Sequence, residues 1–323
     1  MGADAKVASC YEAGRDGFSI HRFLSSAGIE NVVIDPASVE VPRRKRRSKT
    51  DRLDAAKLLT CLMRHRYLGD RQVWRLARVP GEEEEAQRRV HRERERLVRE
   101  STSHRCRIRS LLTLHGACVF DSRLSSLDVS LLRDWAGKAL PENVRAELER
   151  ETARLGMVEE QIAEIERRMR ADVKEPRDDG DRKAAKLAQL KAIAETGART
   201  LVREFFGWRE FRNRREVGSL AGLTGTPYSS GESQTEQGIS KAGNRRVRTL
   251  MIELAWLWLR YQPKSALSIW YESRFGGGNK RQRRIGIVAL ARKLLIALWK
   301  YLEYDLLPEG AELKSAGPTA KRG

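Results

Sequence analysis

The alternation of apolar and polar positions divides the chain into a short α/β part and a long helical part. Two apolar runs, residues 7–11 and 31–34, are typical of buried strands, and residues 17–27 between them have helical spacing. Another helix is expected over 48–65, with an apolar side of Leu53, Leu58, Leu59 and Leu62. The strand–helix–strand order predicts a parallel pair with a right-handed crossover. Because two strands do not make a stable sheet, the remaining strands are either missing or come from elsewhere.

Two long, highly charged helices are predicted next, over residues 81–115 and 141–171. The second has the three-four spacing of a heptad seam. The seam consists of Val144, Leu148, Leu155, Val158, Ile162, Ile165 and Met169. Joined through residues 116–141, the two helices predict an antiparallel coiled-coil arm. Two interpretations of the arm remain open, because the apolar seam requires a partner helix but does not identify it. The arm either serves for dimerisation or reach along DNA, or it is a solvated helical hairpin packed on its own domain.

The rest of the chain is expected to be mainly helical, after a polar linker over residues 174–182. Helices are predicted over 184–204, 216–223, 244–259 and 285–302. Residues 224–243 are rich in Gly, Ser and Thr and are expected to lack regular structure. The expected domains are 1–80 (α/β), 81–180 (arm and linker), 181–307 (helical domain) and 308–323 (disordered tail).

The charge of the chain favours a polyanionic partner. Its 323 residues include 63 Lys and Arg against 44 Asp and Glu, a formal net charge of +19. This excess fits nucleic acid or an acidic membrane surface. The sequence contains no apolar run of about 18 residues, so no membrane span is predicted. The four cysteines have no CxxC spacing, so they are interpreted as reduced thiols of a cytoplasmic protein.

Three carboxylates form a candidate metal site. Asp51 and Asp54 stand three residues apart where a helix is expected to begin, so both can face one point. Glu12 ends the first expected strand, and sites in α/β sheets gather at the carboxyl ends of strands. Such oxygen ligands suit Mg²⁺, and two metal ions there would serve phosphodiester chemistry. Alternatively, Asp51 completes a capping box with Ser48, and Glu12 is a solvated loop acid.

Three basic segments are candidate contacts to nucleic-acid phosphates. The first is the run Arg43, Arg44, Lys45, Arg46 and Arg47. The second lies at an expected helix start and contains Lys241, Asn244, Arg245, Arg246 and Arg248. The third follows a glycine run and begins with Lys280 and Arg281. The second segment also fits an N-capped surface helix, and the third fits a flexible linker with a solvated basic run.

A serine pair precedes a glycine in Tyr228-Ser229-Ser230-Gly231. A serine beside a glycine in a loop can be presented to a substrate as a nucleophile. The simpler interpretation is a plain serine-rich loop, because Ser-Gly pairs are ordinary in loops.

Taken in order, the motifs resemble those of the DEDD-type insertion-sequence transposases, the insertion-sequence-110/1111 family related to the pilin-gene invertase. The resemblance extends from about residue 7 to about residue 305. It is carried by Tyr11-Glu12-Ala13-Gly14, Lys49-Thr50-Asp51-Arg52-Leu53-Asp54-Ala55, Leu220-Ala221-Gly222-Leu223-Thr224, Tyr228-Ser229-Ser230-Gly231 and Gly238-Ile239-Ser240-Lys241-Ala242-Gly243-Asn244-Arg245.

The resemblance implies a partial RuvC-like domain of the RNase H fold, an antiparallel coiled-coil arm and a helical C-terminal transposase domain. It implies a DNA recombinase that cuts and rejoins strands through a covalent phosphoserine. Glu12, Asp51 and Asp54 match the second to fourth positions of a magnesium-binding DEDD tetrad. Ser230, or else Ser229, matches the nucleophile. The implied partners are DNA, a guide RNA in some members, and further copies of the chain as a dimer or tetramer, in a bacterial cytoplasm at the nucleoid.

The start of the chain departs from the family pattern. The family's first aspartate lies on a strand well upstream of the Tyr-Glu-Ala-Gly motif, which begins here at Tyr11. We therefore expect an N-terminally truncated transposase that binds nucleic acid without recombining it. The alternative function is a catalytically dead remnant that acts only as a DNA- or RNA-binding protein. A junction-resolving nuclease would not require the Tyr-Ser-Ser-Gly loop.

Overall fold

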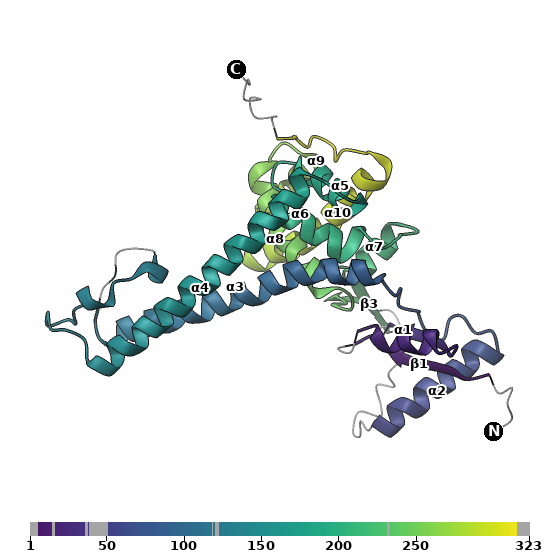
Figure 1. The fold of residues 1–323 in the computed structure, drawn as a ribbon. Helices are drawn as coiled ribbons and strands as arrows, with labels where there is room; N and C mark the ends of the chain where they lie inside the picture. The colour runs from purple at the N-terminus through teal and green to yellow at the C-terminus, as the bar shows by residue number, and fades with distance from the viewer. Residues whose placement is uncertain are drawn as a thin grey trace, which may run out of the picture. The chain divides into compact units, whose positions relative to one another are not determined.

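The computed structural model describes residues 6–14, 17–35, 38, 51–117, 119, 123–230 and 233–314, and of residues 227–230 and 233–237 it describes the backbone. The chain separates into two compact units, Met1–Gly81 and Glu82–Gly323 (Figure 1). The first unit is α/β and the second is mainly helical, which confirms the mixed fold class. Within the described ranges, no helix is long and apolar enough to cross a membrane.

The first unit is built on a parallel strand pair, as the apolar pattern predicted. β1 (Ala8–Glu12) pairs with β2 (Glu30–Ile34), and α1 (Ser19–Ser26) connects them. α2 (Asp51–Tyr67) lies against this pair and contributes Cys61 to a small core with Ile34 and Trp74. Only part of its expected apolar side faces the core: Leu58 and Leu62 pack there, whereas Leu53 and Leu59 are exposed.

A short extended segment that the apolar pattern missed lines the second edge of β2. Ile34 forms an antiparallel bridge with Leu76. The N–H of Ala77 donates to the carbonyl of Val33 at 2.8 Å, and the N–H of Asp35 donates to the carbonyl of Arg75 at 2.9 Å. A strand partner therefore comes from within the same unit. The segment is too short to show an alternation, which explains why periodicity did not reveal it.

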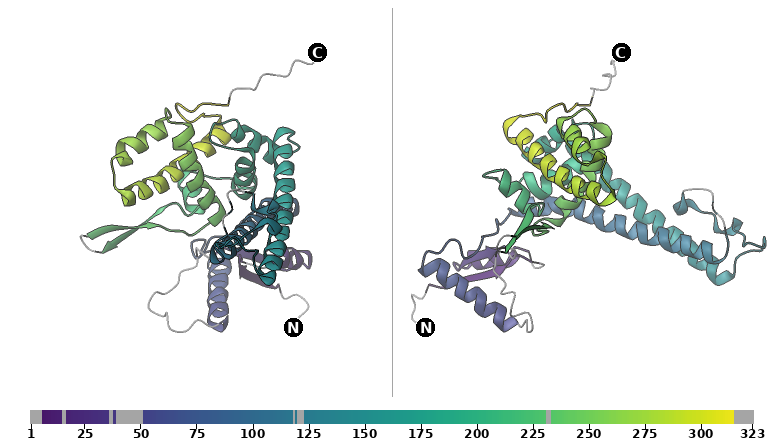
Figure 2. Two further views of the ribbon diagram at one scale, coloured as in Figure 1. Left: turned by 90° about the vertical axis from the view of Figure 1, so that its left-hand side faces the viewer. Right: turned by 180° about the vertical axis from the view of Figure 1, so that it is seen from behind.

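The arm is an antiparallel pair of long helices, α3 (Glu82–Leu114) and α4 (Glu142–Lys174), which lie side by side in both figures (Figures 1 and 2). Cross-helix contacts of basic with acidic side chains run in opposite directions along the two helices: Arg94–Glu166 at 2.6 Å, His104–Glu151 at 2.7 Å and Arg107–Glu147 at 2.5 Å.

The seam of α4 is filled within the chain. Leu148, Leu155, Val158 and Met169 are buried, and Val144, Ile162 and Ile165 are half-buried. Leu97, Ile108 and Leu111 of α3 are buried as well. The partner that the seam required is thus α3. Two 3₁₀ turns, η3 (Leu124–Ser126) and η4 (Val129–Leu131), cover the distal end of the pair through Leu124 and Val129.

Beyond the arm, short helices surround a central pair. α8 (Arg245–Tyr261) and α10 (Lys280–Tyr304) pack together through buried residues such as Trp258 and Leu294. The other elements are α5 (Asp179–Ala188), α6 (Glu195–Leu201), η5 (Val202–Phe206), α7 (Arg214–Leu220), α9 (Ala266–Tyr271) and η6 (Glu272–Gly276).

Several expected boundaries need correction. The predicted helix over residues 184–204 is interrupted between α5 and α6, where Ala192 has a positive φ of 83°. The linker predicted over 174–182 is mostly helical, because α4 runs to Lys174 and Asp178 caps α5. The glycine run after Phe275 is a tight connection rather than a loose linker, since Asn279 and Gln282 form a capping box on α10.

Residues 224–243 were expected to lack regular structure, and this was wrong. β3 (Gly225–Ser230) and β4 (Ser233–Ile239) form an antiparallel hairpin with Tyr228 opposite Thr235 and Ser230 opposite Ser233. The hairpin projects from the helices of the second unit (Figure 2). Polar residues occupy most positions of both strands, so hydrophobic alternation had little to detect.

Close backbone contacts hold the base of this hairpin. The N–H of Ser240 donates to the carbonyl of Thr224 at 2.8 Å, and the N–H of Asn244 donates to the carbonyl of Leu220 at 2.8 Å. Two glycines permit the approach. A Cβ at Gly243 would lie 2.3 Å from the Leu220 carbonyl oxygen, and one at Gly222 would lie 2.5 Å from the Ala242 carbonyl oxygen.

Residues 308–314, which were assigned to a disordered tail, instead have defined contacts. Leu313 bridges Leu190, which precedes α6. The side chain of Gln262 accepts from the N–H of Glu312 and donates to its carbonyl, both at 2.8 Å. The remaining tail residues lie outside the described ranges.

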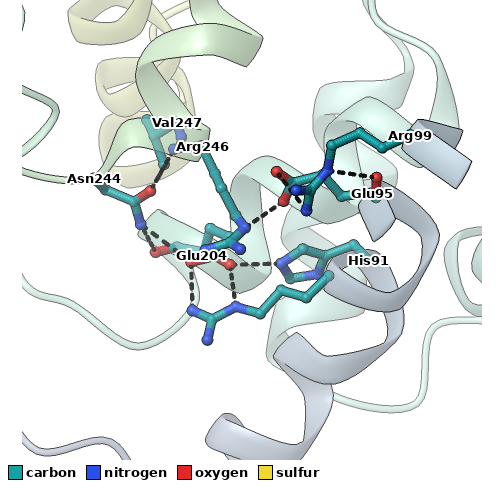
Figure 3. Close-up of polar contacts among 8 residues, drawn as sticks. His91, Glu95, Arg99, Glu204, Asn244, Arg246 and Val247 are labelled. Carbon is teal, nitrogen blue, oxygen red and sulfur yellow. Dashed lines mark hydrogen bonds and ion pairs between the residues drawn. The ribbon is translucent and has the colours of Figure 1, made fainter. Parts of the chain in front are cut away.

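A buried carboxylate joins the root of the arm to the helical body (Figure 3). Glu204 in η5 accepts from His91 Nε2 at 2.8 Å and from Arg92 Nε at 2.7 Å, both on α3. It also accepts from Asn244 Nδ2 at 3.1 Å. Burying a charge costs several kcal/mol unless it is paired and hydrogen-bonded, and these donors meet that need.

The same contacts set the charge states of the pair. Burial alone would raise the pKa of the Glu204 carboxyl, but hydrogen bonds from His91 and Arg92 outweigh it and hold the pKa well below its ordinary value. Burial lowers the pKa of His91, although Glu204 partly opposes this. Protonation would also leave a buried N–H at His91 Nδ1, which has no partner among the described residues.

The hairpin base yields a stability prediction. Gly243→Ala should lower the free energy of unfolding of the second unit by more than Gly238→Ala. Both positions have positive φ, which strains other residues by roughly 1–3 kcal/mol. Only Gly243 adds a collision with backbone, because nothing lies within 4 Å of a Cβ built at Gly238. Urea unfolding followed by tryptophan fluorescence compares them, and equal losses would contradict the packing argument.

His91 yields a pH prediction. Because its pKa is lowered in the folded chain, the unfolded chain binds the proton more readily, so stability should fall as pH drops below about 6.5. One proton limits the slope to about 1.4 kcal/mol per pH unit. Thermal unfolding between about pH 7.5 and 5 measures this slope. His91→Gln keeps a donor for Glu204 but does not titrate, so it should flatten the slope; an unchanged slope would refute the prediction.

Candidate functional site

The three predicted metal ligands are all exposed at element ends in the first unit. Glu12 is the last residue of β1, and Asp51 and Asp54 occupy the first turn of α2. Acidic residues favour a first helical turn because of the helix dipole, so a purely structural role is open to the aspartates. Ser48, the other half of the expected capping box, lies outside the described residues.

The three carboxylates are not found as a ready-made metal centre. In the part of the chain that the structure describes, no group of three or more His, Cys, Asp and Glu side chains is placed to hold a metal ion. The aspartates do remain one helical turn apart, and two carboxylates with water and substrate phosphates are a usual magnesium environment. The pair therefore fits Mg²⁺ in its donor chemistry, and the approach of Glu12 to it stays a prediction.

The candidate nucleophiles lie at the end of a strand. Ser229 and Ser230 are the last two residues of β3, on the strand that leads away from the base of the hairpin. Their backbone pairs with Gln234 and Ser233 of β4. The base is held by α7 and by the residues just before α8, so the position of the serines is set by the helical domain.

Arg248, predicted to contact phosphate, is half-buried and holds the hairpin base. Its Nη1 donates to the carbonyl of Lys241 at 3.0 Å and to that of Ala221 at 3.3 Å. Burial lowers the pKa of the Arg248 guanidinium, and the charge of Arg245 adds to this effect. The guanidinium thus joins the two chain segments that enter and leave the hairpin.

Asn244 and Arg246 are also occupied within the chain (Figure 3). Asn244 Oδ1 caps α8 by accepting from the N–H of Arg246 at 3.0 Å and of Val247 at 3.2 Å. Its Nδ2 donates to Glu204. Arg246 Nε contacts Glu95 Oε2 on α3 at 2.5 Å. These side chains link α8 to the arm, a role that spacing alone did not predict.

The other predicted cations of the second unit are exposed. They are Lys241, Arg245, Lys280 and Arg281. Arg283 and Arg284 extend the exposed group along the first turns of α10, which has no acidic residue in its first turn. Cations near a helix N-terminus are disfavoured by the helix dipole, so a bound phosphate would relieve them. Arg43, Arg44, Lys45, Arg46 and Arg47 lie outside the described residues.

Sequence reasoning missed Glu204, His91 and Arg92. His91 and Arg92 lie in a helix that is rich in charged residues throughout its first half, and Glu204 follows Arg203 in a segment that is otherwise largely apolar. The adjacent charges Arg203 and Glu204, between Val202 and Phe205, were the available signal, because charges flanked by apolar residues imply buried partners.

Comparison with known proteins gives matches to transposases along most of the chain. A family model described as "Transposase IS116/IS110/IS902 family" matches residues 184–268, and a second transposase model, for DEDD transposases of the IS110 type, matches residues 3–116. Together they include Glu12, Asp51, Asp54, Ser229 and Ser230.

Individual relatives carry transposase names. The protein y4rJ of Sinorhizobium fredii is 41% identical over 320 residues, which is 94% of this chain and 79% of that protein. A second from the same organism, y4qE, is 32% identical over 79% of this chain and 59% of its own length. The transposase for insertion sequence element IS1328 of Yersinia enterocolitica is 25% identical over 68% of this chain and 63% of its own length. The chain thus spans less than two thirds of the latter two relatives.

The extent of the first match, together with the two family models in the expected order, shows that the chain belongs to the IS116/IS110/IS902 family of transposases.

Proposed function

We propose that this chain is a DNA recombinase that cuts and rejoins strands of an insertion sequence, with Ser230 as its nucleophile. The expectation that it binds nucleic acid without recombining it is the alternative against which the adduct experiment below decides. The observation that carries the proposal is the position of the serine pair. It ends a strand of a projecting hairpin, inside the region that matches the transposase family. The base of that hairpin is fixed by backbone hydrogen bonds and by Arg248.

The proposed step is a phosphoryl transfer to serine. The Ser230 hydroxyl loses its proton, and its oxygen forms a bond to phosphorus of a DNA phosphodiester. The bond from phosphorus to one strand end breaks, and that end takes up a proton and leaves as a hydroxyl. Attack by another strand's hydroxyl reverses the step and releases the serine. Covalent storage of the phosphoryl bond lets strands be rejoined without a further energy source.

Magnesium is proposed as the cofactor, held by Asp51 and Asp54, with Glu12 as a further ligand implied by the family resemblance. A bound cation would polarise phosphoryl oxygens and offset the charge that develops on them. The exposed aspartate pair and its oxygen-only donor set support this assignment.

DNA is the proposed substrate, gripped by the exposed cations of the second unit and by the run from Arg43 to Arg47. A net charge of +19 supports this partner. The family resemblance extends the proposal further. It adds a guide RNA and a dimer or tetramer as partners, and a place at the nucleoid. It also adds a RuvC-like fold for the first unit and a coiled-coil character for the arm.

DNA affinity should depend steeply on salt. The exposed Arg245 and the hydrogen-bonded Arg248 should contribute differently to this dependence. Arg245→Gln should weaken binding to any sequence and reduce the slope of log affinity against log salt by about one, because it removes a phosphate contact. Arg248→Gln should leave the slope unchanged and instead lower thermal stability, because it removes hydrogen bonds at the hairpin base. Binding isotherms between about 50 and 200 mM salt distinguish the two. The same slope loss in both variants would contradict these assignments.

Covalent chemistry is tested by trapping a protein–DNA adduct on labelled element ends under denaturing conditions. Ser230→Ala should abolish the adduct and leave DNA affinity unchanged, whereas Ser229→Ala should retain it. Omitting magnesium, or introducing Asp51→Asn with Asp54→Asn, should reduce the adduct without changing affinity.

Asp70→Asn is the matched control for the aspartates, because Asp70 is an acid of the same unit that is paired with Arg64. Loss of the adduct in Ser229→Ala alone would move the nucleophile to Ser229. An adduct in every serine variant, or none from the unaltered chain, would overturn the catalytic proposal and leave the nucleic-acid-binding alternative.

A further inference from the structure

Asn244 stands where the serine hairpin returns to the helical body. β4 ends at Ile239, and the short segment that follows reaches the N-terminus of α8 at Asn244. The backbone N–H of Asn244 donates to Leu220 at the C-terminal end of α7. The position of Asn244 therefore sets one side of the hairpin base.

The two polar atoms of this side chain have separate tasks. Oδ1 accepts from two backbone N–H groups at the start of α8, which fixes it as the oxygen. Nδ2 donates to the Glu204 carboxylate at 3.1 Å and to the Glu204 carbonyl at 3.4 Å. An ordinary helix cap needs the oxygen alone. The amide is an additional tie to a buried charge.

Glu204 links Asn244 to the arm. The carboxylate is also bonded to His91 and to both Nε and Nη2 of Arg92, so it is held from the α3 side by a forked pair. Charge-assisted bonds of this kind are stronger and more directional than neutral ones. The pair Arg246–Glu95 spans the same two helices one turn further along α3.

We infer that Glu204 and Asn244 are positioning residues that couple the root of the arm to the hairpin carrying the candidate nucleophile. A displacement of α3 at Arg92 moves the Glu204 carboxylate, and Asn244 passes this to the hairpin base. The arm thereby governs where the serine is presented. This inference rests on the proposed function for its consequence in catalysis, but the mechanical coupling can be measured without it.

The substitution that isolates the tie is Asn244→Ser. Serine is an equally good helix cap, so α8 keeps its cap, but serine has no amide to reach Glu204. DNA affinity should stay within about twofold, while the rate of adduct formation should fall about tenfold to a hundredfold, as expected for a small misplacement of a reacting group. The backbone amide hydrogens of Ser240 and of the residue at position 244 should exchange faster with solvent.

The matched control is Asn213→Ser. Asn213 caps α7 through the N–H groups of Arg215 and Glu216, and among the described residues its side chain hydrogen-bonds through Oδ1 alone. The same exchange there should leave adduct rate and exchange at the hairpin base unchanged. Equal losses in both variants would show that capping, rather than the tie, is what matters, and would overturn the inference.

The arm side is tested with Arg92→Lys, which keeps the charge but removes the fork. It should raise exchange at Ser240 and Asn244, whereas Arg96→Lys, at an exposed surface pair with Glu100, should not. No change at the hairpin base in Arg92→Lys would refute coupling to the arm. If the unaltered chain forms no adduct, the recombinase proposal fails, while the exchange measurements still confirm or refute the coupling.

Discussion

The architecture of the second unit depends on the need to satisfy one buried carboxylate. Glu204 is buried, and an ionised group there is tolerable only when donors surround it. The donors come from α3 and from the start of α8, so solvating this charge forces three distant segments together. Arg199 repeats the arrangement nearby, since its buried guanidinium donates to Asp172 of α4 and Gln87 of α3. Polar contacts, rather than apolar packing alone, thus fix the direction in which the arm leaves the body.

Much of the fold could be predicted because apolar spacing reports directly on which face is buried. The parallel pair, both arm helices and the helices α8 and α10 follow from it. The hairpin and the segment at Leu76 could not be found this way, because one is polar on both faces and the other is very short. The break after α5 was equally hidden, since alanine rarely adopts a positive φ and so gave no sign that Ala192 would do so.

The candidate site divides along a similar line. Motif order was sufficient to identify the family and the serine pair. Residue type could not separate an exposed cation from one that is hydrogen-bonded within the chain. Arg245 and Arg248 are three residues apart with the same chemistry, and only their surroundings distinguish them. For Asn244, the sequence could indicate a cap but not the second bond to Glu204, because that partner is 40 residues away. The convergence of Glu12 with the aspartates remains a prediction.

The contact between Leu313 and Leu190 has a consequence for the order in which the chain can fold during synthesis. The small core of the first unit, with Ile34, Cys61 and Trp74, is complete once Gly81 has emerged from the ribosome. The second unit differs, because Gln262 and the segment before α6 bond to residues near the described end of the chain. Until those residues emerge, the polar groups that they will hydrogen-bond must hydrogen-bond to water instead. The helical body is therefore expected to close late, after the arm and the hairpin have already been made.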